Sequence, residues 1–202
     1  MPRESLFSLA GQTALITGGT RGIGLAIATE FLHAGARVLV CARSADELDR
    51  AVEELTPLGP CEGIVADLVT LDGVNALAVA VGDRVDALHV LVNNAGTQWG
   101  APLEDFPEAG WDKVMDLNVK AVQFLTAALL PLLRAAATPE RPARIVNIGS
   151  ISGIDAPEVD TFSYGASKAA VHLLTRHHAR TLAPEITVNA IAPGTFPSKL
   201  SR

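Results

Sequence analysis

The chain has 202 residues, of which 49% are hydrophobic and 19% charged, with a formal net charge of −6 at pH 7 and a pI near 5.3. This composition is that of a globular protein with a sizeable core, and so acidic a chain lacks the basic surface with which proteins bind nucleic acids. No run approaches the roughly 18 apolar residues of a membrane span, and the start "MPRESLFSLAGQ" lacks the apolar segment of a signal peptide. We therefore expect no membrane contact.

The expected elements alternate regularly along the chain. Short apolar, β-branched segments predict strands at 13–17, 37–42, 61–66, 88–92, 144–149 and 186–192. Between them lie stretches with helical periodicity, such as 24–35 and 112–136, while 135–144 reads as a surface loop. Strands that are apolar at nearly every position are buried on both faces, and alternation with helices implies parallel pairing. The sequence predicts an α/β fold: a Rossmann-like, doubly wound parallel sheet with helices on both faces, forming a single domain over 1–202.

The cysteines and histidines do not form a metal-binding pattern. Cys41 and Cys61 lie in expected strands without C-x-x-C spacing, so we expect them to be reduced core residues of a cytoplasmic protein. His177 and His178 are adjacent and point in different directions on a helix, and His172 does not share their face at i,i+4 spacing. We therefore expect no metal site.

The first expected strand runs directly into a glycine-rich stretch, "TGGTRGIG" at 17–24. A turn from strand to helix needs residues without a Cβ where φ is positive or where another backbone comes close, and Gly18, Gly22 and Gly24 supply them. The helix that follows offers unpaired N–H groups and a positive dipole end to an anion such as pyrophosphate. A glycine-rich string alone is a weak signal, but its position after the first strand predicts a dinucleotide site.

The end of the second expected strand indicates which dinucleotide is bound. In a doubly wound fold this end faces the adenosine ribose, where an NAD site usually places an acid. The sequence here reads Ala42 and then Arg43, and Arg21 lies within the glycine turn. A cation after an uncharged residue suits a 2′-phosphate, so we predict NADP(H), with NAD(H) as the alternative. A second interpretation, that both arginines are ordinary surface residues, stays open.

Further motifs follow in order along the whole chain. They are "ADL" at 66–68, "NNAG" at 93–96, "LNV" at 117–119, "IGSISG" at 148–153, Y-x-x-x-K at Tyr164–Lys168, and "PG" at 193–194. Together with the glycine turn, this ordered set resembles the short-chain dehydrogenase/reductase family. The stretches "SYGASKAAVHLLT" and "ITVNAIAPGTFPSKL" look closest to members that reduce 3-oxoacyl thioesters, including rhamnolipid-associated reductases.

The resemblance implies an oxidoreductase that interconverts the carbonyl and secondary alcohol forms of a small-molecule substrate by hydride transfer. It also implies that Asp67 hydrogen-bonds adenine, that Asn93 and Asn94 tie the central strands together, and that Ser198 stands where the family often has a threonine near the carboxamide. Asparagine stabilises turns in any fold, so part of that role is structural. The residues implied to bind the cofactor are Gly18, Thr20, Arg21, Gly22, Ile23, Gly24, Arg43, Asp67, Leu68, Asn94, Ala95, Gly96, Tyr164, Lys168, Pro193 and Gly194.

Tyr164 and Lys168 are four residues apart in an apolar stretch, which places them on one helix face. Spacing alone favours the interpretation that both are surface residues. Carbonyl reduction, however, needs a proton donor as charge develops on oxygen, and an ammonium beside a phenol, whose pKa is ordinarily near ~10, favours the phenolate. The resemblance implies that Lys168 also binds the nicotinamide ribose, that Ser150 donates to the substrate oxygen and that Asn118 holds an ordered water. The expected catalytic set is Ser150, Tyr164, Lys168 and Asn118.

Several residues near this set are candidates for the wall of the substrate pocket. Ser150 follows its strand directly and is favoured over Ser152, which we expect to line the pocket or to face away. Phe162 and the loop 151–161 are expected pocket walls. Trp99, just after "NNAG", is expected to be a packing residue, with substrate contact as the alternative.

Two helices are apolar on more than one face, which core burial against the sheet or a subunit interface would explain. The resemblance favours the interface and implies a homodimer or homotetramer. In the stretches 112–135 and 164–183 these residues are Val114, Leu117, Val119, Val122, Leu125 and Leu129, and Ala169, Val171, Leu173 and Leu174.

The sequence departs from the family at its C-terminal end. Family members continue with a mobile segment, a further helix and a seventh strand, whereas this sequence stops at Arg202. It could be a fragment of weak or no activity, or a compact form that closes its site by oligomerisation. Two functions therefore stay open: an NADP(H)-dependent carbonyl reductase or alcohol dehydrogenase, and a truncated, catalytically impaired dinucleotide-binding protein.

Overall fold

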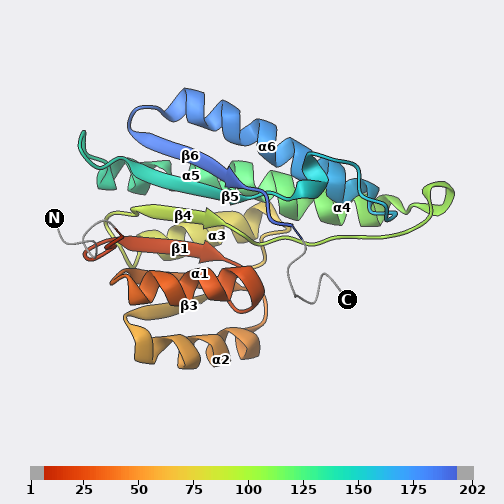
Figure 1. Cartoon of the computed structure of the whole chain (residues 1–202). Helices are drawn as coiled ribbons and strands as arrows, with labels where there is room; N and C mark the ends of the chain where they lie inside the picture. Colours follow the sequence, from red (N-terminus) through yellow and green to blue (C-terminus); the bar gives the residue numbers. More distant parts are fainter. Residues whose placement is uncertain (1–6, 195–202) are drawn as a thin grey trace.

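A single parallel sheet organises the protein. The computed structural model describes residues 7–194, so Ser198 lies outside the described residues. Its strands pair in the order β3-β2-β1-β4-β5-β6, and their arrows point the same way in Figure 1. The strands are β1 (Thr13–Thr17), β2 (Arg37–Ala42), β3 (Cys61–Val65), β4 (Val90–Asn93), β5 (Ala143–Ile148) and β6 (Ile186–Ile191). The predicted doubly wound α/β sheet is confirmed.

Helices cover both faces because successive strand residues point to opposite sides. Leu15 packs into the core beneath α3 and α5, whereas Ala14 and Ile16 pack beneath α1 and α2. The helices are α1 (Gly22–His33), α2 (Ala45–Leu55), α3 (Leu71–Gly82), α4 (Glu108–Met115), α5 (Ala121–Ala136) and α6 (Phe162–Leu182), with short turns η2 (Thr56–Leu58), η3 (Leu103–Asp105), η4 (Asp116–Lys120) and η5 (Ile151–Gly153).

Strand β4 departs most from its expected bounds. The apolar run 88–92 predicts a strand, but β4 begins at Val90 and ends at Asn93. The N–H of Leu88 donates to Leu132 O at 3.0 Å, so this residue is anchored to α5 before the ladder starts. Asn93 pairs in register with Asn147 of β5. Asn93, the first residue of the "NNAG" motif, is therefore the last residue of β4.

The expected helix at 112–136 is interrupted by one wide turn. Between α4 and α5, η4 is a π-helical turn, a form that is rare and frequent at functional sites. By length and composition alone, the run Glu108–Ala136 could cross a membrane, which the sequence did not lead us to expect. Helices in the core of soluble proteins can be equally long and apolar, and Leu125, Leu129 and Leu133 are buried against the sheet. The length and hydropathy of this run are therefore weak evidence for a membrane span.

A buried chain of polar side chains ties the middle of the sheet to its helices. Asn93 Nδ2 donates to Asn147 Oδ1 at 2.8 Å, and Asn147 Nδ2 donates to Thr175 Oγ1 of α6 at 2.8 Å. All three residues are buried. Because unpaired buried amides are costly, these bonds fix β4, β5 and α6 relative to one another. The expectation that Asn93 helps to tie the central strands therefore agrees with its contacts.

His89, which directly precedes β4, makes the stability of the fold depend on pH. His89 Nδ1 accepts the backbone N–H of Thr13 at 3.0 Å, which requires the neutral ring. Burial, and then Arg144, lower the pKa of His89 from its usual 6.5. Below pH 6.5 the His89 ring takes up a proton more readily in the unfolded chain than in the folded protein. The neutral ring's contribution to stability is therefore fully present above pH 6.5 and is lost as the pH falls below 6.5.

We expect the melting temperature to fall as the pH is lowered from about 8 to about 5. His89→Asn keeps a hydrogen-bond acceptor without titrating, so its melting temperature should depend less on pH. Some pH dependence should remain in this variant, because the pKa of His178 is also lowered, by burial and by His177, and its protonation likewise destabilises the fold at low pH. Thermal unfolding followed by circular dichroism measures both proteins, and an equal pH dependence in the two would contradict this role of His89.

Candidate active site

The glycine turn has the backbone that its sequence predicts. Gly18 and Gly22 have φ of 64° and 55°, and a Cβ on Gly24 would clash with the carbonyl oxygen of Gly18. Helix α1 begins at Gly22, its N-cap Arg21 makes no side-chain capping bond, and its first turn contains no acid. An uncapped N-terminus at a turn of this shape suits an anionic ligand. Thr20 and Ile23 are half-buried in the same turn.

A threonine hydroxyl joins this turn to the "NNAG" segment. Thr17 Oγ1 accepts the N–H groups of Asn94 and Ala95 at 2.9 and 3.0 Å. Asn94 Nδ2 donates back to Thr17 O and Gly18 O at 2.8 and 3.0 Å. The sequence had not singled out Thr17, although its place directly before Gly18 was a usable signal. These bonds hold the ends of β1 and β4 together.

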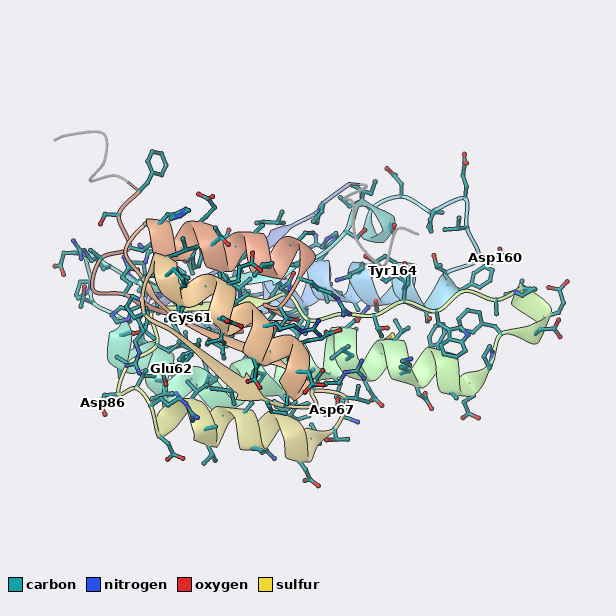
Figure 2. The ribbon with its side chains drawn as sticks, turned by 90° about the horizontal axis from the view of Figure 1, so that it is seen from below. Cys61, Glu62, Asp67, Asp86, Asp160 and Tyr164 are labelled. Carbon is teal, nitrogen blue, oxygen red and sulfur yellow. The ribbon has the colours of Figure 1, made fainter. Side chains whose placement is uncertain are left out.

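The residues expected around the adenosine lie near the ends of β2 and β3. Arg43 directly follows β2 and is exposed, and Asp67 closely follows β3 and is exposed. One carboxylate oxygen of Asp67 accepts the N–H of Val69 at 3.2 Å. Leu68 is only 5% exposed and belongs to the core. Figure 2 shows Asp67 toward the same end of the molecule as Tyr164, with Cys61 and Glu62 toward the other.

Ser150 is placed to donate a hydrogen bond. It is the N-cap of η5, directly after the sheet, and its hydroxyl accepts the N–H of Ser152 at 3.1 Å. A hydroxyl that accepts from the backbone keeps its own hydrogen for another partner. Ile151 donates to Pro193 O at 3.1 Å, which brings the expected "PG" segment beside this turn.

Lys168 is buried, so its interpretation as a surface residue is wrong. Its side chain is 5% exposed and its ammonium donates to Ile148 O, at the end of β5, at 2.6 Å. The same nitrogen lies 5.6 Å from the centre of the Tyr164 ring. Burial lowers the pKa of Lys168 to about 8. An ammonium has three donors, so two more hydrogen bonds remain open to a ligand.

Asn118 lies in the π turn η4, and its side chain acts as a tie. Its Oδ1 accepts the N–H of Thr97 at 2.9 Å, and its Nδ2 donates to Thr97 O and to Ser167 Oγ, each at 2.9 Å. Both amide hydrogens are thus engaged, which leaves the second lone pair of Oδ1 as the open hydrogen-bonding position of this side chain. A Cβ on Gly96 would lie 3.3 Å from Asn118 Oδ1 and 3.8 Å from Lys168 Nζ. Gly96, Asn118 and Lys168 therefore meet.

Two outer segments extend the site beyond the sheet. Ala101 N–H donates to Asp160 O at 3.1 Å, and the rings of Phe106 and Phe162 meet edge to face at 5.7 Å. Trp99 lies close over Gly110, where a Cβ would come within 2.7 Å of the indole. This supports the packing interpretation of Trp99. Ile151 and Ile154 are exposed on the loop that was expected to form a pocket wall.

Among the described residues, no three His, Cys, Asp or Glu side chains are grouped as a metal site would need. Cys41 and Cys61 are buried and unpaired, as expected.

Comparisons with known proteins decide the family. The family model described as short chain dehydrogenase matches residues 12–202. The chain belongs to the short-chain dehydrogenase family. It is an oxidoreductase of that family, acting between CH–OH and C=O groups.

Individual relatives agree with this assignment. The rhamnolipids biosynthesis 3-oxoacyl-[acyl-carrier-protein] reductase of Pseudomonas aeruginosa is 52% identical over 197 residues, which cover 97% of this chain and 77% of that protein. A gluconate 5-dehydrogenase of Gluconobacter oxydans is 35% identical over 204 residues, covering 100% and 77%. The solved Pseudomonas aeruginosa RhlG/NADP active-site complex superposes with a TM-score of 0.95 at 51% identity, covering 97% and 77%.

The glycine turn makes a direct prediction. Because Gly24→Ala forces a Cβ against the Gly18 carbonyl, we expect a loss of about 1–3 kcal/mol in the free energy of unfolding, together with weaker dinucleotide binding. Urea unfolding and nucleotide titration measure the two effects. Gly82→Ala is the matched control, because its Cβ would meet nothing within 4 Å near the end of α3. If Gly24→Ala is as stable as this control, the turn is less tightly packed than described.

Proposed function

We propose that the protein is an NADP(H)-dependent oxidoreductase that interconverts a 3-oxoacyl thioester and its 3-hydroxy form. The observation that carries the proposal is the Lys168 ammonium, buried at 5% exposure and hydrogen-bonded to the end of β5 beside Tyr164. The thioester substrate is supported by the name of the 52% identical relative, and the cofactor by the NADP complex among solved structures.

The residues present fit a dinucleotide. The uncapped start of α1 and the left-handed glycines, Gly18 and Gly22, suit its pyrophosphate. Exposed Arg21 and Arg43 suit a 2′-phosphate, and Asp67 suits the adenine. Lys168 and the segments at Asn94–Gly96 and Pro193–Gly194 suit the nicotinamide end. The remaining cofactor-binding residues of the proposal lie in the segments that surround this site; they are Thr20, Ile23, Leu68 and Ala95.

When bound, the cofactor supplies the hydride that adds to the carbonyl carbon. Ser150 holds the substrate oxygen through the hydrogen that its contact with Ser152 leaves free. Tyr164 delivers its phenolic proton to that oxygen, which ends as the alcohol. Lys168 stabilises the phenolate that is left and supports its return to the phenol. Asn118 positions this set by tying Thr97 to Ser167.

We further propose that the protein is a homodimer or homotetramer, and that it works in the cytoplasm. Helices α4 to α6 leave Trp111, Phe124 and Leu173 exposed at 41%, 45% and 51%. A groove of about 420 Å³ beside them is lined by Met115, Asp116, Val119, Lys120, Gln123, Phe124 and Leu174. Such a face is typical of a subunit interface. Two buried, unpaired cysteines suit a reducing compartment.

Tyr164→Phe tests the proposed proton donor. The change removes one hydroxyl, so we expect NADPH to bind as before while turnover falls by about 10²–10⁴-fold. NADPH oxidation with a panel of 3-oxoacyl thioesters, ketones and quinones measures activity, and NADPH fluorescence measures binding. An unchanged melting temperature controls for folding. Equal rates in variant and parent would remove Tyr164 from the mechanism, and no activity of the parent on any thioester would remove that substrate class.

The lowered pKa of Lys168 predicts a pH profile. Below about pH 8 the side chain is an ammonium, and above it the charge is lost. We expect kcat/KM for carbonyl reduction to be level below this pH and to fall by about tenfold per pH unit above it. Returning each sample to neutral pH before a second assay separates titration from unfolding. A profile that stays level well above about pH 9 would contradict the role of the ammonium.

A further inference from the structure

Glu47, in the first turn of α2, forms an ion pair that reaches across to the glycine turn. Arg21 Nη1 lies 3.2 and 3.0 Å from the two carboxylate oxygens of Glu47. The side chains are 57% and 35% exposed. Arg43 stands four residues before Glu47, at the end of β2. Glu47 therefore pairs with one of the two arginines that the proposed function gives to the 2′-phosphate.

The local sequence gives Glu47 another possible partner. Ser44-Ala45-Asp46-Glu47 has the spacing of a capping box, in which the fourth residue bonds back to the N–H of the first. Ser44 keeps its half of that pattern by accepting the N–H of Glu47 at 3.3 Å. Across the described residues, the only hydrogen bonds of the Glu47 carboxylate are those to Arg21. The carboxylate is thus directed at the neighbouring turn and not at its own helix.

This pairing has opposite consequences for the two nicotinamide cofactors. A 2′-phosphate carries negative charge, so a carboxylate beside its arginine repels it and also competes for the same guanidinium nitrogen. A cofactor with a free 2′-hydroxyl meets no such repulsion. Removing the carboxylate should therefore favour only the phosphorylated cofactor.

We propose that Glu47 is a specificity-determining residue that limits the preference for NADPH over NADH by holding Arg21 in competition with the 2′-phosphate. The inference rests on the proposed function, since it assumes a nicotinamide dinucleotide at this turn. Glu47 is a positioning residue: it acts through Arg21 and takes no part in hydride or proton transfer.

The test compares NADPH and NADH binding in four variants and the parent. Glu47→Gln keeps the backbone N–H that Ser44 caps and removes only the charge. Glu54→Gln is the matched control, because it makes the same change two turns along the same exposed face of α2. Arg21→Gln alone and combined with Glu47→Gln completes a double-mutant cycle. Nucleotide fluorescence at constant ionic strength gives each Kd without requiring turnover.

We expect Glu47→Gln to tighten NADPH binding by roughly three- to tenfold and to change NADH binding by less than about twofold. Glu54→Gln should alter neither by more than about twofold. The gain should be smaller when Arg21 is absent, because only the direct repulsion between carboxylate and phosphate then remains. Weaker or unchanged NADPH binding in Glu47→Gln would overturn the inference, as would an equal gain for NADH, an equal effect of Glu54→Gln, or a gain of undiminished size without Arg21. A parent that binds neither nucleotide would overturn the proposed function as well.

Discussion

The structure depends on keeping one ammonium where little water reaches it. A fall in the pKa of Lys168 from 10.5 to about 8 corresponds to about 3 kcal/mol of lost preference for the charged form. The bond to Ile148 O offsets part of the desolvation by giving the charge a carbonyl at the end of a strand. Close packing also keeps water away from Lys168. Gly153 lies so near α6 that a Cβ on it would come within 2.5 Å of the Lys168 backbone. The nitrogen held in this way lies 5.6 Å from the centre of the Tyr164 ring.

Two sets of buried hydrogen bonds bring the parts of the site into register. Thr17 and Asn94 join the ends of β1 and β4, where the glycine turn starts. Asn93, Asn147 and Thr175 join β4, β5 and α6. Ser150 follows closely after β5, and Lys168 lies in α6. Because a buried amide is satisfied at only one relative position of its partners, a shift of one element would leave polar groups unpaired in both sets. The glycine turn, Ser150 and Lys168 are therefore positioned by the same central strands.

The sequence predicted those features whose cause is local. Apolar runs and alternation predicted the strands and their parallel pairing, and the glycines at 18, 22 and 24 predicted a turn that favours residues without a Cβ. Helical spacing put Tyr164 and Lys168 together, although it could not show that Lys168 is buried. The contacts of Asn118 with Thr97 and of Arg21 with Glu47 span 21 and 26 residues. Such contacts arise from the packing of α2 and η4 on the sheet, which no short pattern encodes.

The two halves of the site differ in how firmly they are built. The half beneath the glycine turn and β5 is held by the ends of parallel strands and by several buried side-chain bonds. The outer half, formed by the segment after Gly96 and the loop after Ser150, is joined by the bond from Ala101 to Asp160 and the contact of Phe106 with Phe162. A rigid inner half suits the hydride and proton transfers, which demand fixed geometry. Side chains that are exposed on this outer half, such as Ile151 and Ile154, can change without disturbing that geometry, so substrate choice can vary while the chemistry stays the same.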